Sequence, residues 1–134
     1  MKTLRGYITS RKFMGENCHQ STQNLVLRDY CERMNYKYLL SGTEYSIKNS
    51  YLMLQQLVDE IPTINGIVAY SLFQMPENQE KRLQIINKIL DRNGELHFAL
   101  ENLKVSVNSE IDRVENIWLV RQTMPKCITS LTSY

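Results

Sequence analysis

Apolar residues along the chain alternate between short continuous runs and longer stretches in which they recur every three or four positions. Short runs bounded by polar or turn-forming residues predict strands, and the longer spacing predicts helices with one buried face. The two patterns follow one another four times, in the order strand then helix. The predicted strands are Leu4–Thr9, Tyr36–Leu40, Ile67–Phe73 and Leu96–Leu100.

The predicted helices have recognisable starts and stops. Ser21 can cap the first helix, in which Leu27, Tyr30, Cys31 and Met34 share one face, and this helix ends near Asn35. Pro62 stops the second helix, and Asn93-Gly94 supplies a stop for the third. The later starts are predicted at Asn49 or Ser50, at Pro76, and at Asn108 or Ser109.

Strand, helix, strand units of this length favour parallel pairing with right-handed crossovers. The pattern therefore predicts an α/β fold: a small, doubly wound, mainly parallel sheet of four or five strands, flavodoxin-like, with a long C-terminal helix. No repeat or linker divides the chain, so we expect a single α/β domain at 1–125 and a C-terminal tail at 126–134.

Composition and charge narrow the class of protein. The 134 residues are 43% apolar and 22% charged, which is ordinary for a globular domain. The formal net charge of +2 is spread evenly, so nucleic acid is an unlikely partner on this criterion. No apolar run reaches the ~20 residues of a membrane span, and the N-terminus has no signal-like apolar stretch. We therefore expect a cytoplasmic protein that does not bind membranes.

The cysteines and glycines give no sign of a metal or cofactor. Cys18, Cys31 and Cys127 are odd in number and widely spaced, which favours free thiols in a reducing compartment. With His19 and His97 they form none of the paired spacings of zinc sites. No Walker or dinucleotide-binding glycine motif occurs. We expect no metal and no cofactor.

In sheets of this type ligands bind at the carboxyl ends of the strands, which directs attention to the loops 10–20, 41–48, 71–78 and 101–106. Arg11 and Lys12 stand close before the first helix, and His19 and Gln20 lie at its start. Cations beside a helix N-terminus suit a phosphate or carboxylate. Equally, both cations can be ordinary solvated loop residues.

Two acids fall on the same predicted rim, Glu44 on the second loop and Glu101 on the fourth. Carboxylates in different environments can divide the roles of general acid and general base. A solvated surface acid is the more common explanation for each. Tyr45 could offer a flat surface for stacking a sugar or a base.

One set of segments shares a resemblance: Gly6-Tyr7, Gln23, Leu27, Tyr30-Cys31, Ser41-Gly42, 54–61 and 67–70. In this order they resemble the catalytic domain of serine recombinases of the resolvase and invertase type. That resemblance implies their fold and a homodimer built through the C-terminal helix. Where their first strand reads Y-x-R-x-S, Thr9 stands for the arginine and Arg11 for the nucleophilic serine, and their D-R-L-x-R segment is replaced by 71–76.

A second resemblance covers most of the chain, from Arg5 to about Pro125. The segments 5–11, 23–31, 43–45 and 70–73 look like those of the small bacterial "sporadic carbohydrate cluster" proteins, which are known from genes of surface-polysaccharide functions. This resemblance implies a role in bacterial surface-carbohydrate biosynthesis.

Two hypotheses follow, and a third is weaker. The first is an enzyme acting on a sugar phosphate or nucleotide sugar; its predicted catalytic residues are Ser10, Arg11, Glu44 and Glu101, and its predicted substrate-binding residues are Lys12, His19, Gln20, Gln23, Tyr45, Ser71 and Gln74. The second is a non-catalytic dimeric partner or regulator with a resolvase-like fold. The third is a serine recombinase that cleaves DNA.

Overall fold

The computed structural model describes residues 1–10, 18–44 and 51–132, and side chains as far as residue 121. Within these ranges five strands form one sheet, and four helices pack around it. The strands are β1 (Thr3–Thr9), β2 (Lys37–Glu44), β3 (Gly66–Ala69), β4 (Glu95–Phe98) and β5 (Leu103–Val105). The helices are α1 (Gln20–Arg33), α2 (Leu52–Asp59), α3 (Gln79–Asp91) and α4 (Ile111–Thr132), with short 3-10 turns η1 (Leu72–Gln74) and η2 (Asn108–Glu110).

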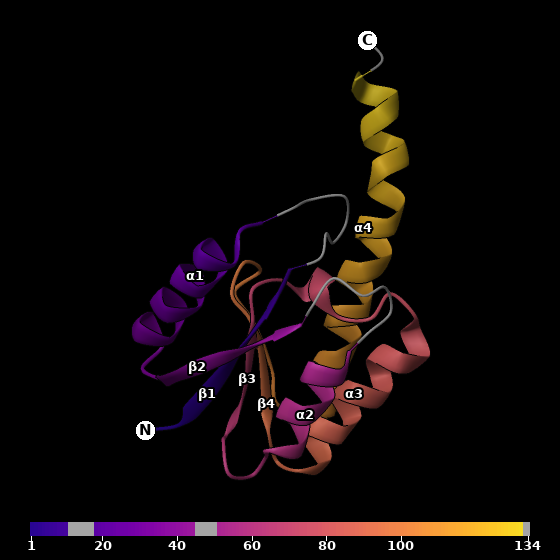
Figure 1. Cartoon of the computed structure of the whole chain (residues 1–134). Coiled ribbons are helices and arrows are strands. Elements are labelled where there is room, and N and C mark those ends of the chain that lie inside the picture. Colours follow the sequence, from indigo (N-terminus) through magenta and orange to yellow (C-terminus); the bar gives the residue numbers. More distant parts are fainter. Residues whose placement is uncertain (11–17, 45–50, 133–134) are drawn as a thin grey trace.

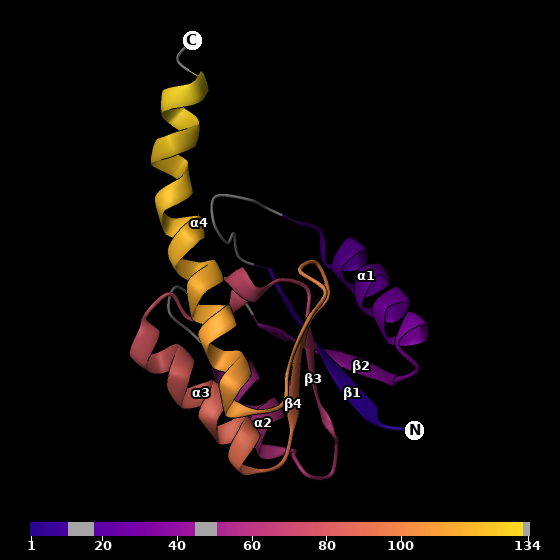
Figure 2. The same cartoon turned by 180° about the vertical axis from the view of Figure 1, so that it is seen from behind.

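The strand order is β2-β1-β3-β4-β5, and every neighbouring pair is parallel except β4 with β5. Helix α1 covers one face of the sheet, while α2, α3 and α4 lie on the other (Figures 1 and 2). The expected α/β fold with a mainly parallel sheet is confirmed. Within the described ranges, no helix is both long and apolar enough to cross a bilayer.

The two faces of the sheet have separate cores. Because side chains alternate along a strand, Leu4 and Ile8 of β1 face α1, whereas Tyr7 faces the other helices. Central strand β3 is buried over its whole length, as expected for a strand covered on both sides. The larger core includes Trp118 of α4, whose side chain is buried.

Some predicted boundaries are wrong. Strand β2 continues through 41–44, which the sequence predicted as a loop; Gly42 sits in the strand after an irregularity that shifts the register between Arg5 and Tyr7 of β1. The predicted third strand ends at Ala69 and gives way to η1. The predicted loop 101–106 contains β5, a strand that the pattern did not show.

The starts of two helices also differ from prediction. Helix α3 begins at Gln79 and not at Pro76, because the Asn78 side chain accepts a hydrogen bond from the Lys81 amide at 3.0 Å and caps the helix there. Helix α1 begins at Gln20, with His19 as its N-cap. The predicted division at residue 125 falls inside α4.

Candidate functional site

The carboxyl ends of β1, β2, β3 and β4 bring six of the predicted site residues to one edge of the sheet. Parallel strands end on the same side, so the loops that follow them meet there. Ser10 follows β1, Glu44 ends β2, and Glu101 follows β4. Ser71 and Gln74 belong to the turn after β3, and Gln23 comes from the first turns of α1. We call this edge the rim.

Gln23 and Gln74 are buried in a hydrogen-bonded network with Thr9. The Gln23 amide accepts from the Thr9 backbone N–H at 3.1 Å and donates to the Thr9 carbonyl at 2.8 Å, as a neighbouring strand would. Gln74 Nε2 donates to Gln23 Oε1 at 2.8 Å and to Thr9 Oγ1 at 3.1 Å. All three residues are at most 1% exposed, so the network ties α1, β1 and η1 together and leaves no free amide toward solvent.

Ser71 and Glu101 organise the start of η1. The Leu72 backbone N–H donates to Glu101 Oε1 at 2.8 Å, and Ser71 Oγ donates to Glu101 Oε2 at 2.9 Å. The Phe73 N–H donates in turn to Ser71 Oγ at 3.1 Å. Both carboxylate oxygens of Glu101 therefore bind groups of the chain itself. This arrangement fixes the η1 turn against the loop after β4.

Glu44 fixes the start of helix α2 in the way that Glu101 fixes the start of η1. Its carboxylate is buried at 4% exposure and accepts from the backbone N–H groups of Met53 and Leu54 at 3.1 and 3.4 Å. These N–H groups belong to the first turn of α2, where a helix lacks internal acceptors and where negative charge is favourable. Tyr7 also donates its hydroxyl to Glu44 Oε1 at 3.2 Å.

Other predicted site residues lie elsewhere or outside the described ranges. His19 and Gln20 are exposed at the start of α1, and no side-chain hydrogen bond joins either to the six rim residues in the described part of the chain. Ser10 is partly exposed, and its backbone N–H and hydroxyl both donate to the Glu44 carbonyl, at 3.0 and 3.3 Å. Arg11, Lys12 and Tyr45 lie outside the described residues.

The described part of the rim is rich in hydrogen-bond acceptors. None of the described residues between β1 and α1, between β2 and α2, between β3 and α3, or between β4 and β5 is lysine or arginine. Among residues 1–10, 18–44 and 51–121, no three His, Cys, Asp or Glu side chains gather in a way that could hold a metal ion. The chemistry available in this part of the rim is hydrogen bonding by side chains that already have partners.

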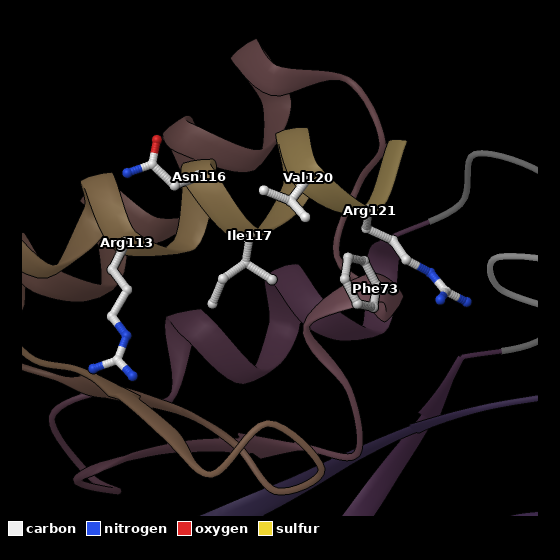
Figure 3. A pocket seen from close by; sticks show the side chains of 6 residues that line it. All are labelled: Phe73, Arg113, Asn116, Ile117, Val120 and Arg121. Atoms are coloured by element: carbon white, nitrogen blue, oxygen red, sulfur yellow. The ribbon is translucent and has the colours of Figure 1, made fainter. Parts of the chain in front are cut away.

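Sequence reasoning missed a second feature, a groove of about 560 Å³ between α4 and η1 (Figure 3). Ile117 and Val120 already extend the apolar stripe of the last helix in the sequence, which is the signal that could have pointed to it. Phe73 was assigned to a strand, so its place beside that helix could not be foreseen. The groove is lined by Phe73, Arg113, Asn116, Ile117, Val120 and Arg121.

Tyr30, His97 and Glu95 form a buried, hydrogen-bonded polar network on the α1 face, which the sequence analysis did not find. Tyr30 shares a hydrogen bond of 2.7 Å with Nδ1 of His97, and Nε2 lies 2.9 Å from Glu95 Oε1. Burial raises the pKa of Tyr30 to about 12 and lowers that of His97. Burial opposes ionisation of Glu95, but hydrogen bonds from Lys2, His97 and Tyr36 outweigh it and lower its pKa to about 2. These hydrogen bonds hold strand β4 to its surroundings.

Two solved structures have the same fold as this chain. The N-terminal catalytic domain of the TP901-1 integrase has a TM-score of 0.63 at 14% identity, over 95% of this chain and 98% of that one. A resolvase family site-specific recombinase from Streptococcus pneumoniae has a TM-score of 0.60 at 12% identity, over 97% of this chain and 99% of that one. The fold is therefore like that of resolvase and integrase catalytic domains.

Comparison by sequence gives no further relative. No protein-family model matches the chain, and no curated protein matches it. The resemblance to the sporadic carbohydrate cluster proteins has no support from these comparisons. At such low identity to the two structures, the likeness concerns the fold alone.

Proposed function

We propose that this chain is a non-catalytic domain with a resolvase-like fold that acts as a homodimeric partner or regulator. Two observations support the proposal: the shape and sequence of α4, and the state of the rim. The shape and sequence of α4 support the dimer, and the hydrogen bonds that Glu44 and Glu101 form with backbone N–H groups support the non-catalytic role.

Helix α4 has 22 residues, and its C-terminal half projects beyond the rest of the domain (Figures 1 and 2). Leu119 and Val120, at the point where it leaves the domain, are 61% and 55% exposed. From there the sequence continues with apolar residues at helical spacing. These residues are Val120, Met124, Cys127, Ile128 and Leu131. A projecting helix with an apolar stripe is best stabilised by packing against a second copy.

The rim supports the non-catalytic half of the proposal. Glu44 and Glu101, the two acids that could move a proton, accept backbone hydrogen bonds at helix starts. Phosphoryl transfer needs positive charge placed where the transition state becomes more negative. The described segments of the rim supply none, and hydrophobic or amide side chains, Leu72 to Gln74, occupy the position where the recombinase motif has arginines.

Sedimentation velocity at micromolar concentration tests the dimer. We expect the wild-type chain to be a dimer and an Ile128→Asp variant to be a monomer, because the aspartate would place a charge in the apolar stripe. Leu25→Asp is the matched control, since Leu25 is 69% exposed on α1, across the sheet from α4. A wild-type monomer throughout the micromolar range would overturn the proposal.

DNA strand cleavage is a second candidate, favoured by the fold and by one residue. The solved TP901-1 domain is described as catalytic, and Ser10 lies partly exposed at the end of β1 in this chain. Incubation with supercoiled plasmid, followed by denaturing electrophoresis, would reveal a covalent serine–DNA product that is absent from a Ser10→Ala variant. We expect no such product.

The sugar enzyme remains a prediction that rests on the sequence resemblance and on the polar side chains expected at the rim. It assigned proton transfer to Glu44 or Glu101 and anion binding to Arg11. If Arg11→Ala or Glu44→Ala abolished a thermal shift produced by a sugar phosphate or nucleotide sugar, while the fold was retained, this hypothesis would displace the one proposed above. We expect no shift with either class of compound.

A further inference from the structure

The groove between α4 and η1 has apolar walls that come from two different elements. Phe73 of η1 forms one side, and Ile117 and Val120 of α4 form the other (Figure 3). The Phe73 ring is itself held in place, because it packs edge to face against the buried Trp118 with ring centroids 5.1 Å apart. At about 560 Å³ the groove has the size of a small-molecule site.

The two charged residues among the described lining of the groove are both arginines. Arg113 and Arg121 lie toward opposite ends, with Ile117 between them (Figure 3). Arg113 is exposed and forms no ion pair or hydrogen bond with any described residue. Arg121 lies over the Phe73 ring, 5.6 Å from its centroid. An apolar floor bounded by guanidinium groups complements an apolar molecule that carries an anionic group.

The spacing of the two arginines sets the length of that molecule. They are eight residues apart on α4, and a rise of ~1.5 Å per residue separates them by about 12 Å. A chain of about eight carbons or a pair of aromatic rings fits this length when its carboxylate lies at Arg113. The groove is too short for a peptide helix of several turns.

We propose that this groove binds a small amphipathic organic anion, with an apolar body against Phe73, Ile117 and Val120 and its carboxylate at Arg113. The site is independent of the rim and goes beyond the proposed role in dimerisation. It would give the domain a binding activity for medium-chain or aromatic carboxylates.

Calorimetric titration with octanoate, and with 1-octanol as its neutral match, tests the site on the full chain. We expect octanoate to bind with one-to-one stoichiometry and about tenfold more tightly than octanol, the gain of a charge-assisted hydrogen bond. In Arg113→Gln we expect the two ligands to bind equally. In Ile117→Gln both should bind about tenfold more weakly, because a polar amide would then face the apolar body.

Two control variants lie on α1, across the sheet from the groove: Arg28→Gln and Leu25→Gln should bind both ligands as wild type does. Far-ultraviolet circular dichroism confirms that each variant is folded. Amide resonances of Phe73 and Ile117 should shift on addition of octanoate.

Three results would overturn the proposal: no saturable binding of octanoate, equal binding of octanoate and octanol by wild type, or unchanged binding in Ile117→Gln. A wild type that does not bind octanoate, together with an Ile117→Gln variant that no longer dimerises, would show that a second copy fills the groove. Sedimentation velocity tests dimerisation in a separate experiment. A monomeric wild type would therefore contradict the proposed function without contradicting the ligand site.

Discussion

The two glutamates of the rim show how a side chain with apparent catalytic chemistry can serve the backbone. Glu44 is buried and accepts from the N–H groups of Met53 and Leu54 and from the Tyr7 hydroxyl. Removing an acceptor while its donors remain buried costs the desolvation free energy of those donors. The role of Glu44 can therefore be tested by stability, without any assay of activity.

We expect Glu44→Ala to lower the free energy of unfolding by about 2 kcal/mol, because the first-turn N–H groups of α2 lose their acceptor. Glu44→Gln keeps one oxygen and should cost less. Urea denaturation followed by circular dichroism gives both values. Glu32→Ala, at an exposed position on α1, is the control and should change stability little. Equal stability of Glu44→Ala and wild type would show that the carboxylate is not a structural acceptor.

His97 should make the protein less stable in mild acid. Burial lowers its pKa below the ordinary 6.5, so below that pH the unfolded chain binds a proton that the folded chain does not. Stability must then fall as the pH drops from 7 toward 5. His97→Gln should remove most of this dependence, and His19→Gln, at an exposed position, should keep it. Midpoints of urea denaturation at pH 7, 6 and 5 provide the comparison, and an unchanged dependence in His97→Gln would contradict it.

Glu95 causes a second loss of stability at lower pH. Its folded pKa of about 2 lies below the ordinary 4.5, so its contribution is complete above about 4.5 and is lost as the pH falls toward 2. We expect the pH at which acid unfolds the wild type to rise in a Lys2→Gln variant, because the Lys2 ammonium helps to hold Glu95 ionised. Acid titration followed by circular dichroism measures this shift. An acid transition at the wild-type pH in the variant would contradict it.

At the residue scale the sequence indicated which side chains gather but not what they do. The order of the strands brings Ser10, Glu44, Ser71 and Glu101 to one edge, which was predictable from the parallel topology. Gln23 was predicted to bind substrate, yet it bonds the backbone of Thr9. Such a pairing depends on side-chain distances across elements, which spacing along the chain does not contain.

At the element scale the apolar runs predicted the central strands well and the edge strands poorly. Gly66–Ala69 is buried on both faces and gives an unmistakable signal. β5 has only three residues, with Lys104 exposed between two buried neighbours, so its pattern is too short to recognise. Ser41-Gly42 is typical of a turn, but it lies in β2 at the register shift opposite Gly6.

Close contacts at Gly6 and Gly66 predict which of the two glycine-to-alanine substitutions destabilises the protein more. A Cβ at Gly66 would lie 2.3 Å from the backbone oxygen of Glu95, whereas one at Gly6 would lie 2.5 Å from the Tyr38 hydroxyl, the end of a side chain. Side chains move more easily than a paired strand. We expect Gly6→Ala to cost about 1–3 kcal/mol and Gly66→Ala to cost more. Urea denaturation compares them, and the reverse order would contradict this account.

Helix α4 is fixed to α3 by a buried ion pair. Arg82 Nη2 and Nε donate to the two oxygens of Glu115 at 2.6 and 2.8 Å, and the guanidinium stacks 4.4 Å from the centre of Trp118. Burial opposes ionisation of Glu115, but the hydrogen bond and the charge of Arg82, together with a hydrogen bond from Gln79, outweigh it and lower the pKa. These contacts set the position of α4 on the domain.

Breaking this pair from one side should be costly. We expect Arg82→Met to destabilise the protein by about 3 kcal/mol, because the Glu115 carboxylate is left without its charge partner. The double variant Arg82→Met, Glu115→Leu should regain most of that loss, since no unpaired charge remains. Urea denaturation followed by Trp118 fluorescence measures the free energy of unfolding of both variants, with a probe at the α3–α4 contact. A double variant no more stable than Arg82→Met would show that the other contacts of Arg82, with Trp118 and with the Pro76 and Glu77 carbonyls, carry the stability in place of the charge pair.

At the scale of the whole molecule, the fold was predictable because its units repeat: a strand and a helix, four times. The antiparallel β5 and the position of α4 break that repetition, and the position of α4 depends on contacts distant in sequence, such as that between Arg82 and Glu115. The two-sided core places α1 alone on one face and three helices on the other (Figures 1 and 2). The proposed dimer uses only the part of α4 that leaves this layered body.

A chain that ends at Arg121 should therefore keep the body and lose the dimer. Trp118 and the Arg82–Glu115 pair lie before this point, so we expect the near-ultraviolet circular dichroism of Trp118 to be retained. The thermal midpoint of the full chain should rise with protein concentration, as dissociation accompanies unfolding, and that of the shortened chain should not. A concentration dependence in the shortened chain would place the subunit contact on the body.

The strand order has a consequence for synthesis on the ribosome. β1 sits between β2 and β3, yet it precedes both in the sequence, so it emerges before either neighbour exists. The backbone of β1 cannot pair along both of its edges until the chain has been made through Ala69. During that interval the nascent strand is a candidate for chaperone binding, and slower translation between Glu44 and Gly66 would prolong its exposure.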